Sequence, residues 1–237
     1  GTSGWHYKHW RGPFYPDALP PRDMLAFYAK RFDTVELNNT FYRLPTPHAL
    51  KLWRDGTPDG FCFAVKGSRY LTHMRKLTDP EAGLARFLPL VEILGDKLGP
   101  IIFQLPPHWR LNRDRLKQFL SALPDRHRYA FEFRDPTWHV PEVFSLLEHY
   151  NAAFCLYELA GVSSPIQLTA DFVYVRLHGP GKAYQGSYSA RALRAWADRI
   201  RQWRTQLKAV YFYFDNDQAG FARAVEAAQV VGLDIAG

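Results

Sequence analysis

Cysteine is scarce in this chain: Cys62 and Cys155 are the two among 237 residues. Two cysteines cannot build a disulfide framework or, by themselves, a zinc site. Both lie in apolar segments, so we expect buried free thiols in a protein of the reducing cytoplasm. No apolar run approaches the length of a membrane span and no signal peptide is visible, which argues against a membrane partner.

Glycine-rich nucleotide motifs are missing as well. No G-x-G-x-x-G turn follows the first expected strand, so the sequence lacks the motif that binds flavin and nicotinamide cofactors. The P-loop motif is missing too. There is no internal repeat, low-complexity tract or linker, and 47% of the residues are hydrophobic. Residues 1–237 therefore predict a single domain. Residues 1–5 resemble the tail of a first strand, so we expect a few residues upstream.

Acidic residues are outnumbered by basic ones, which gives a formal net charge of +7 and an isoelectric point of about 9.4. This balance favours anionic partners such as phosphorylated small molecules or nucleic acid. Aromatic residues make up 16% of the chain. That share predicts a site or groove lined with flat apolar surfaces.

The most informative pattern is a short apolar strand that ends in polar residues on one face. Across residues 172–178, Val173 and Val175 share one face, whereas Arg176 and His178 share the other. The segments that divide in the same way are residues 34–38, 61–66, 101–105, 129–134 and 210–215. An apolar outer face and a charged inner face at the carboxyl ends of the strands predict an enzyme-like (β/α) barrel.

Eight strand candidates alternate with helix candidates along the chain. The strands are expected to end near Trp5, Asn38, Lys66, Gln104, Arg134, Tyr157, His178 and Asn216. The helices are expected over residues 22–31, 47–54, 80–94, 112–123, 141–150, 189–207 and 218–231, with Asp79 and Ser189 as N-caps. This order predicts the α/β class and a (β/α)8 TIM-type barrel, a parallel eight-stranded sheet with outer helices. An open α/β sheet is the alternative.

Several blocks, in order along nearly the whole chain, resemble the YecE-like proteins, a family also called domain of unknown function 72. They are GTSGW at residues 1–5, VELNNTFYR at 35–43, FCFAVK at 61–66, LGPIIFQLPP at 98–107, EFR at 132–134 with Trp138, VRLHG at 175–179 and YFDND at 213–217. The last block commonly carries two asparagines in the family, and Asp215 stands at one of those positions here. The resemblance implies a TIM-type barrel and leaves the reaction undefined.

The polar residues at the strand ends predict a site at the carboxyl-terminal mouth of the barrel. The leading hypothesis is an enzyme for a small anionic, phosphorylated ligand, with phosphoester hydrolysis as the reaction. The expected catalytic residues are Glu36, Glu132, His178 and Asp215, with Glu36 or Glu132 as the general base and His178 as acid or base. The expected ligand-binding residues are Trp5, Asn38, Tyr42, Lys66, His73, Gln104, Arg134, Trp138, Arg176 and Asn216. In this set Lys66, Arg134 and Arg176 would hold the anion, and Trp5, Tyr42 and Trp138 would stack on a ring.

Three alternatives remain open. A metal-dependent hydrolase or isomerase would hold a divalent metal with Glu36, Glu132, His178 and Asp215, although no metal-binding spacing supports it. A nucleic-acid-binding module without catalysis would use the positive charge and the aromatic loops. A purely structural network would pair Glu36 with Lys66, and Glu132 with Arg134 or Arg176.

Overall fold

The strands close into a barrel, as the sequence predicts. The computed structural model describes residues 1–215. Within this range eight parallel strands follow one another around the sheet, and β5 also pairs with β6, which closes the ring. These strands are β1 (Thr2–Ser3), β2 (Thr34–Leu37), β3 (Cys62–Lys66), β4 (Leu98–Gln104), β5 (Tyr129–Glu132), β6 (Ala153–Leu159), β8 (Phe172–Leu177) and β9 (Ala209–Phe214). The short β7 (Val162–Ser163) pairs antiparallel with β6.

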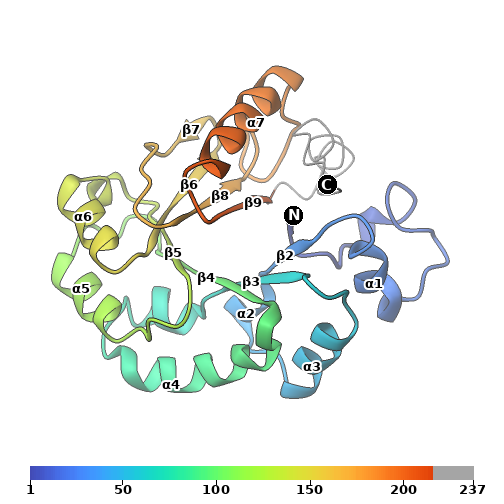
Figure 1. Ribbon diagram of the computed structural model, residues 1–237, viewed down its shortest axis with the longest axis horizontal. Coiled ribbons are helices and arrows are strands. Elements are labelled where there is room, and N and C mark those ends of the chain that lie inside the picture. Colours follow the sequence, from blue (N-terminus) through green and yellow to red (C-terminus); the bar gives the residue numbers. More distant parts are fainter. Residues whose placement is uncertain (216–237) are drawn as a thin grey trace.

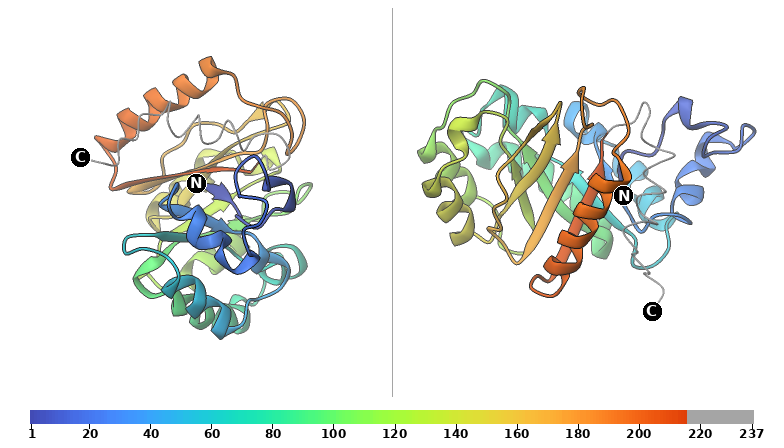
Figure 2. Two further views of the ribbon diagram at one scale, coloured as in Figure 1. Left: turned by 90° about the vertical axis from the view of Figure 1, so that its right-hand side faces the viewer. Right: turned by 90° about the horizontal axis from the view of Figure 1, so that it is seen from above.

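Helices cover the outside of the barrel, with α3 to α6 on one side and α7 on the other (Figures 1 and 2). The α-helices are α1 (Met24–Tyr28), α2 (Asn39–Tyr42), α3 (Pro47–Asp55), α4 (Pro80–Val91), α5 (Arg113–Ser121), α6 (Pro141–His149) and α7 (Ala190–Arg204). Short turns are η1 (Lys8–Trp10), η2 (Pro21–Asp23), the π-helix η3 (Tyr70–Met74), η4 (Glu92–Lys97) and η5 (Pro136–Trp138). No helix within residues 1–215 is both long and apolar enough to cross a membrane.

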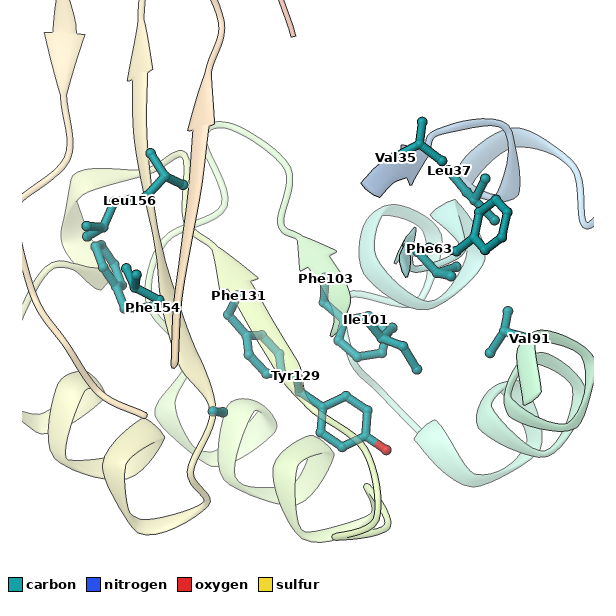
Figure 3. Packing of buried hydrophobic residues seen from close by; sticks show 14 of the residues in the cluster. Val35, Leu37, Phe63, Val91, Ile101, Phe103, Tyr129, Phe131, Phe154 and Leu156 are labelled. Atoms are coloured by element: carbon teal, nitrogen blue, oxygen red, sulfur yellow. The ribbon is translucent and has the colours of Figure 1, made fainter. Parts of the chain in front are cut away.

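The outer face of the barrel is a continuous apolar layer. Figure 3 shows Phe63, Ile101, Phe103 and Phe131 pointing from their strands toward the surrounding helices. All four side chains are completely buried. The apolar outer face predicted from strand alternation is therefore confirmed.

The inner face carries a second, smaller cluster. Ala64, Ile102, Ala130, Tyr174 and Tyr213 belong to this cluster, and all are buried. Each lies at an odd spacing from a residue of the outer layer, as the two-residue period of a strand requires. Beyond this apolar cluster, at the carboxyl ends of the strands, the inner face becomes polar.

One local prediction is wrong. Asp79 does not cap α4, because its backbone is left-handed and its carboxylate pairs with Arg75 instead. Between β6 and β8 the chain forms no helix: it runs back along β6, where Ser164 and Thr169 hydrogen-bond to the β6 backbone. The expected helix over residues 218–231 and Asn216 lie outside the described residues, whereas the Ser189 cap of α7 is confirmed.

The outer layer makes a prediction about stability. The Phe103 ring contacts Phe119 and Phe131 at centroid distances of 4.8 and 5.5 Å. Phe103→Ala should lower the free energy of unfolding by about 3–5 kcal/mol, because it removes buried apolar surface and leaves a cavity. Leu52→Ala on α3, where the side chain is 58% exposed, is the control and should change little. Denaturant titrations that gave equal losses for the two variants would contradict this packing.

Candidate functional site

A buried arginine lies at the centre of the polar cluster at the carboxyl end of the barrel. Arg176, near the end of β8, has no exposed surface. Its Nη1 donates to Glu132 Oε2 at 2.6 Å, and its Nη2 donates to Glu36 Oε1 and Asp215 Oδ2, both at 2.8 Å. These bonds join β2, β5, β8 and the end of β9 across the barrel. Charges can be buried here because each has a partner of opposite sign.

The Glu36 carboxylate is fixed by two more hydrogen bonds. Ser3 Oγ, at the end of β1, donates to Glu36 Oε1 at 2.5 Å, and Tyr174 OH donates to Oε2 at 2.6 Å. Asn38 Nδ2 in turn donates to Ser3 Oγ at 2.5 Å. Both oxygens of this fully buried carboxylate are engaged, so Glu36 is arranged to position Arg176 rather than to accept a proton from a ligand.

Glu132 is held between two arginines. Arg134 Nε donates to its Oε1, and Arg176 donates to its Oε2. Burial raises the pKa of Glu132, but the charges of Arg134, Arg176 and His178 outweigh burial and hold that pKa well below its usual range. A carboxylate of such low pKa stays ionised and is a weak base.

His178 follows β8 and lies between Asp215 and Arg134. Its Nδ1 lies 2.9 Å from Asp215 Oδ2, and Arg134 Nη2 donates to its Nε2 at 3.1 Å. An arginine can only donate, so His178 Nε2 is the acceptor in this contact. Burial raises the pKa of Asp215, but Arg176 and His178 lower it overall. An imidazole that lies next to a carboxylate is an arrangement found in general bases.

Lys66, the last residue of β3, differs from the two arginines. Its ammonium lies 4.7 Å from the centroid of the Phe41 ring, and the side chain is half-buried. Within residues 1–215, no carboxylate lies within ion-pair distance of its Nζ. Burial, followed by the charge of Arg176, lowers the pKa of Lys66 to about 8.

His73, on the π-helix η3, also contacts Phe41. Its ring meets Phe41 edge-on at 4.9 Å between centroids, and its Nδ1 lies 2.9 Å from Thr72 Oγ1. Burial, and then the charge of Lys66, lower the pKa of His73 to about 4. The imidazole is therefore uncharged at neutral pH.

The aromatic residues expected to stack on a ligand do not converge. Trp138 is fully buried and its ring stacks on Phe133 at 4.9 Å, so it is a core residue whose faces are closed to a ligand in this structure. Trp5 packs edge-on against Trp53 at 5.3 Å. Tyr42 is 79% exposed.

Two half-buried amides complete the mouth. Gln104 Oε1 lies 3.4 Å from Arg176 Nη1, at the long end of the hydrogen-bond range. Asn38 Oδ1 is buried and has no hydrogen-bond partner in the described part of the chain. Asn216, the remaining expected ligand-binding residue, lies outside the described residues.

The salt-bridge pattern differs in part from the predicted one. Glu132 pairs with both Arg134 and Arg176, as expected. The predicted pair of Glu36 with Lys66 is wrong, because Arg176 on β8 pairs with Glu36 instead.

The Arg176 guanidinium also fills the space that a divalent metal would take among the carboxylates. Among residues 1–215, no group of three or more His, Cys, Asp or Glu side chains is arranged to hold a metal ion.

Ser3 and Tyr174 belong to the network although they are absent from the expected site. Strand alternation in residues 172–178 already places Tyr174 on the inner face with Arg176. Ser3 lies at the end of the first strand, next to Glu36 in the register of β1 and β2. Strand alternation alone could therefore have predicted that Tyr174 belongs to the site. Predicting Ser3 would have required the pairing of β1 with β2.

The network predicts a large effect of removing Arg176. Arg176→Met leaves Glu36, Glu132 and Asp215 as buried charges without their common partner. We expect the free energy of unfolding at pH 7 to fall by about 3–5 kcal/mol, measured by denaturant titration. Arg194→Met, at an exposed position of α7, is the matched control and should change little.

The pH dependence of the stability lost in Arg176→Met distinguishes an electrostatic effect from a packing effect. In the wild type, Glu132 and Asp215 have lowered pKa values, so their contribution is present above the ordinary values of 4.5 and 3.8 and is lost as the pH falls. In Arg176→Met the same carboxyls protonate readily. The difference between the two proteins should therefore shrink below pH 4.5. A constant difference from pH 7 to pH 3 would contradict the electrostatic explanation.

Comparison with known proteins agrees with the fold. The family model "Protein of unknown function DUF72" matches residues 1–233. The UPF0759 protein YecE of Escherichia coli (strain K12) is 33% identical over 113 residues, which cover 47% of this chain and 42% of YecE, so the matched region spans less than half of that relative. The UPF0759 protein YunF of Bacillus subtilis (strain 168) is 24% identical over 261 residues, covering 94% of this chain and 89% of YunF.

Solved structures match over most of the chain. A DUF72 family protein from Thermotoga maritima MSB8 superposes with a TM-score of 0.87 at 26% identity, covering 97% of this chain and 96% of that one. Another, from Enterococcus faecalis V583, has a TM-score of 0.74 at 16% identity over 87% of this chain and 85% of that one, and it shows the fold alone. Since the family model spans nearly the whole sequence, the chain belongs to the DUF72 family.

Proposed function

We propose that the mouth of the barrel is the site of an enzyme for a small anionic ligand, with phosphorylated compounds as the first class to test. The Lys66 ammonium carries the proposal, because it is half-buried and no carboxylate of the described residues neutralises it. A charge withdrawn from water costs free energy until a partner supplies the opposite charge. A bound anion would be that partner.

Neighbouring groups suit the same ligand. Arg134 keeps 8% of its side chain exposed above Glu132, and guanidinium groups match the geometry of phosphate oxygens. Asn38 and Gln104 are half-buried beside this layer and offer amide groups. Glu36 and Arg176 have no exposed surface, so they would support the site from beneath rather than contact the ligand.

His178 and Asp215 are the proposed proton-transfer pair. If a bound phosphate draws Arg134 away, the Nε2 lone pair of His178 becomes available to take a proton from an attacking water. Asp215 would then stabilise the imidazolium through Nδ1. Phosphoester hydrolysis is therefore the reaction we propose. In this scheme Glu36 and Glu132 act as positioning residues.

We also propose a cytoplasmic location, because the two cysteines are free thiols.

A polynucleotide is the second candidate ligand. Tyr42 and Tyr70 are 79% and 45% exposed on segments that follow β2 and β3, and Arg69 is exposed beside them. Exposed aromatic rings next to cations suit stacked bases and phosphates. A titration with single-stranded oligonucleotide would favour this candidate if binding weakened steeply with salt and exceeded that of phosphate.

Anion binding should depend on Lys66. Lys66→Met should weaken sulfate binding at pH 7 by at least about tenfold, because one charge-assisted hydrogen bond contributes roughly 1.5–3 kcal/mol. Isothermal titration calorimetry measures the dissociation constant. Lys51→Met, at an exposed position of α3, removes the same charge away from the mouth and should bind sulfate like the wild type.

The same titration has a predicted pH dependence. Sulfate keeps its charge from pH 6 to pH 10, whereas Lys66 loses its proton as the pH rises through about 8. Wild-type affinity should fall over that range, and Lys66→Arg should retain its affinity because arginine stays charged. An affinity that is equal for the wild type and Lys66→Met would refute the proposed site.

Hydrolysis should depend on His178. With p-nitrophenyl phosphate and its diester as substrates, His178→Gln should lower turnover by roughly 10²–10⁴-fold, the usual contribution of a general base. Sulfate binding should survive, because His178 is buried beneath the anion site. A wild-type protein that binds sulfate but cleaves neither ester would disprove hydrolysis and leave the binding site standing.

A further inference from the structure

Lys66 occupies an environment that the other described lysines lack. Lys208 pairs with Asp171, and Lys97 donates to backbone carbonyls at 2.6 Å. The remaining lysines, at positions 8, 30, 51, 76, 117 and 182, are exposed. Lys66 alone among the lysines of residues 1–215 is half-buried at the barrel mouth, with the face of Phe41 below its ammonium.

The charged groups around Lys66 act in opposite directions. Arg176 disfavours the ammonium form, whereas Glu36, Glu132 and Asp215 favour it from a distance. Those carboxylates are already bound to Arg176, and burial is the largest influence, so the ammonium is weakened overall. The pKa of about 8 follows from this arrangement, so about a tenth of Lys66 is a free amine at pH 7.

A proton-transfer group lies beside the amine. His73 and Lys66 both contact Phe41, at 4.9 and 4.7 Å from the ring centroid, and the charge of Lys66 lowers the pKa of His73. A neutral imidazole can take a proton from an attacking amine and return it to a leaving hydroxyl. The charges of Lys66 and Arg134 both lower the pKa of His73, so the amine, the imidazole and the guanidinium interact electrostatically at the mouth.

We propose that Lys66 is a nucleophile that forms an imine with the aldehyde or ketone group of an anionic ligand. The amine nitrogen bonds to the carbonyl carbon, and the carbonyl oxygen takes a proton to give a carbinolamine. Loss of water then forms the C=N bond, so one water leaves for each imine and no oxidant or reductant is needed. This inference rests on the proposed anion site, since Arg134 holds the anionic end of the ligand while Lys66 attacks its carbonyl.

Pyridoxal 5′-phosphate, an aldehyde that carries a phosphate, is the probe. The protein is incubated with it at pH 7, sodium borohydride reduces any imine to a stable amine, and peptide mapping by mass spectrometry locates the label. A pKa of about 8 instead of 10.5 puts about 300-fold more Lys66 in the amine form at pH 7. The weaker nucleophilicity of a less basic amine offsets part of this gain, so Lys66 should label at least about tenfold faster than Lys51.

Two controls identify the chemistry. Lys66→Arg keeps the positive charge and the bound anion but should abolish the label at this position. Sulfate should slow labelling of Lys66 and leave Lys51 unaffected. His73→Phe, which keeps an aromatic ring against Phe41, should slow imine formation without weakening sulfate binding, because the ring no longer moves a proton.

The possible failures of the two proposals are distinguishable. Sulfate binding with no preference for Lys66 over Lys51 would overturn the imine proposal and leave the anion site intact. Rapid labelling of Lys66 that sulfate does not slow would support Lys66 as a nucleophile and contradict the proposed anion site. Absence of both sulfate binding and selective labelling would overturn both.

Discussion

The ion pairs of Arg176 are the interaction on which the rest of the site depends. One guanidinium joins Glu36, Glu132 and Asp215, whose strands lie on different sides of the barrel. Without it, Glu36 would have no cationic partner and Glu132 would keep only Arg134, so burying these carboxylates in ionised form would cost more free energy. The geometry of the mouth, including the His178 imidazole that Asp215 orients, therefore follows from the position of one side chain.

This arrangement divides the polar residues into two layers. The lower layer, formed by Glu36, Glu132 and Arg176, is completely buried, and Arg176 donates to both carboxylates. The upper layer contains Lys66, Arg134 and the half-buried amides. Because the carboxylates are bound to Arg176, they do not neutralise Lys66 at close range, and the accessible layer stays electropositive. The buried network would thus lie beneath the proposed ligand site and leave that site its positive charge.

Strand alternation predicted the barrel, its outer core and the inner-face position of Arg176, because side-chain parity is a local property of each strand. It could not pair the charges. Glu36 meets Arg176 rather than Lys66 because closure of the ring brings β8 opposite β2, a relation between distant segments. The sequence predicts that Trp138 stacks on a ligand, but in the structure the η5 turn folds its indole back onto Phe133. Such contacts depend on tertiary packing that no local pattern encodes.

The central claim is that an anion binds between Lys66 and Arg134 at the mouth of the barrel. The most direct test is a crystal structure of the protein with tungstate, a tetrahedral dianion whose anomalous scattering locates it without ambiguity. We expect a tungstate within hydrogen-bond distance of Lys66 Nζ and of the Arg134 guanidinium, above an unchanged Arg176 network. Ordered tungstate elsewhere on the surface with none at the mouth, under saturating conditions, would contradict it.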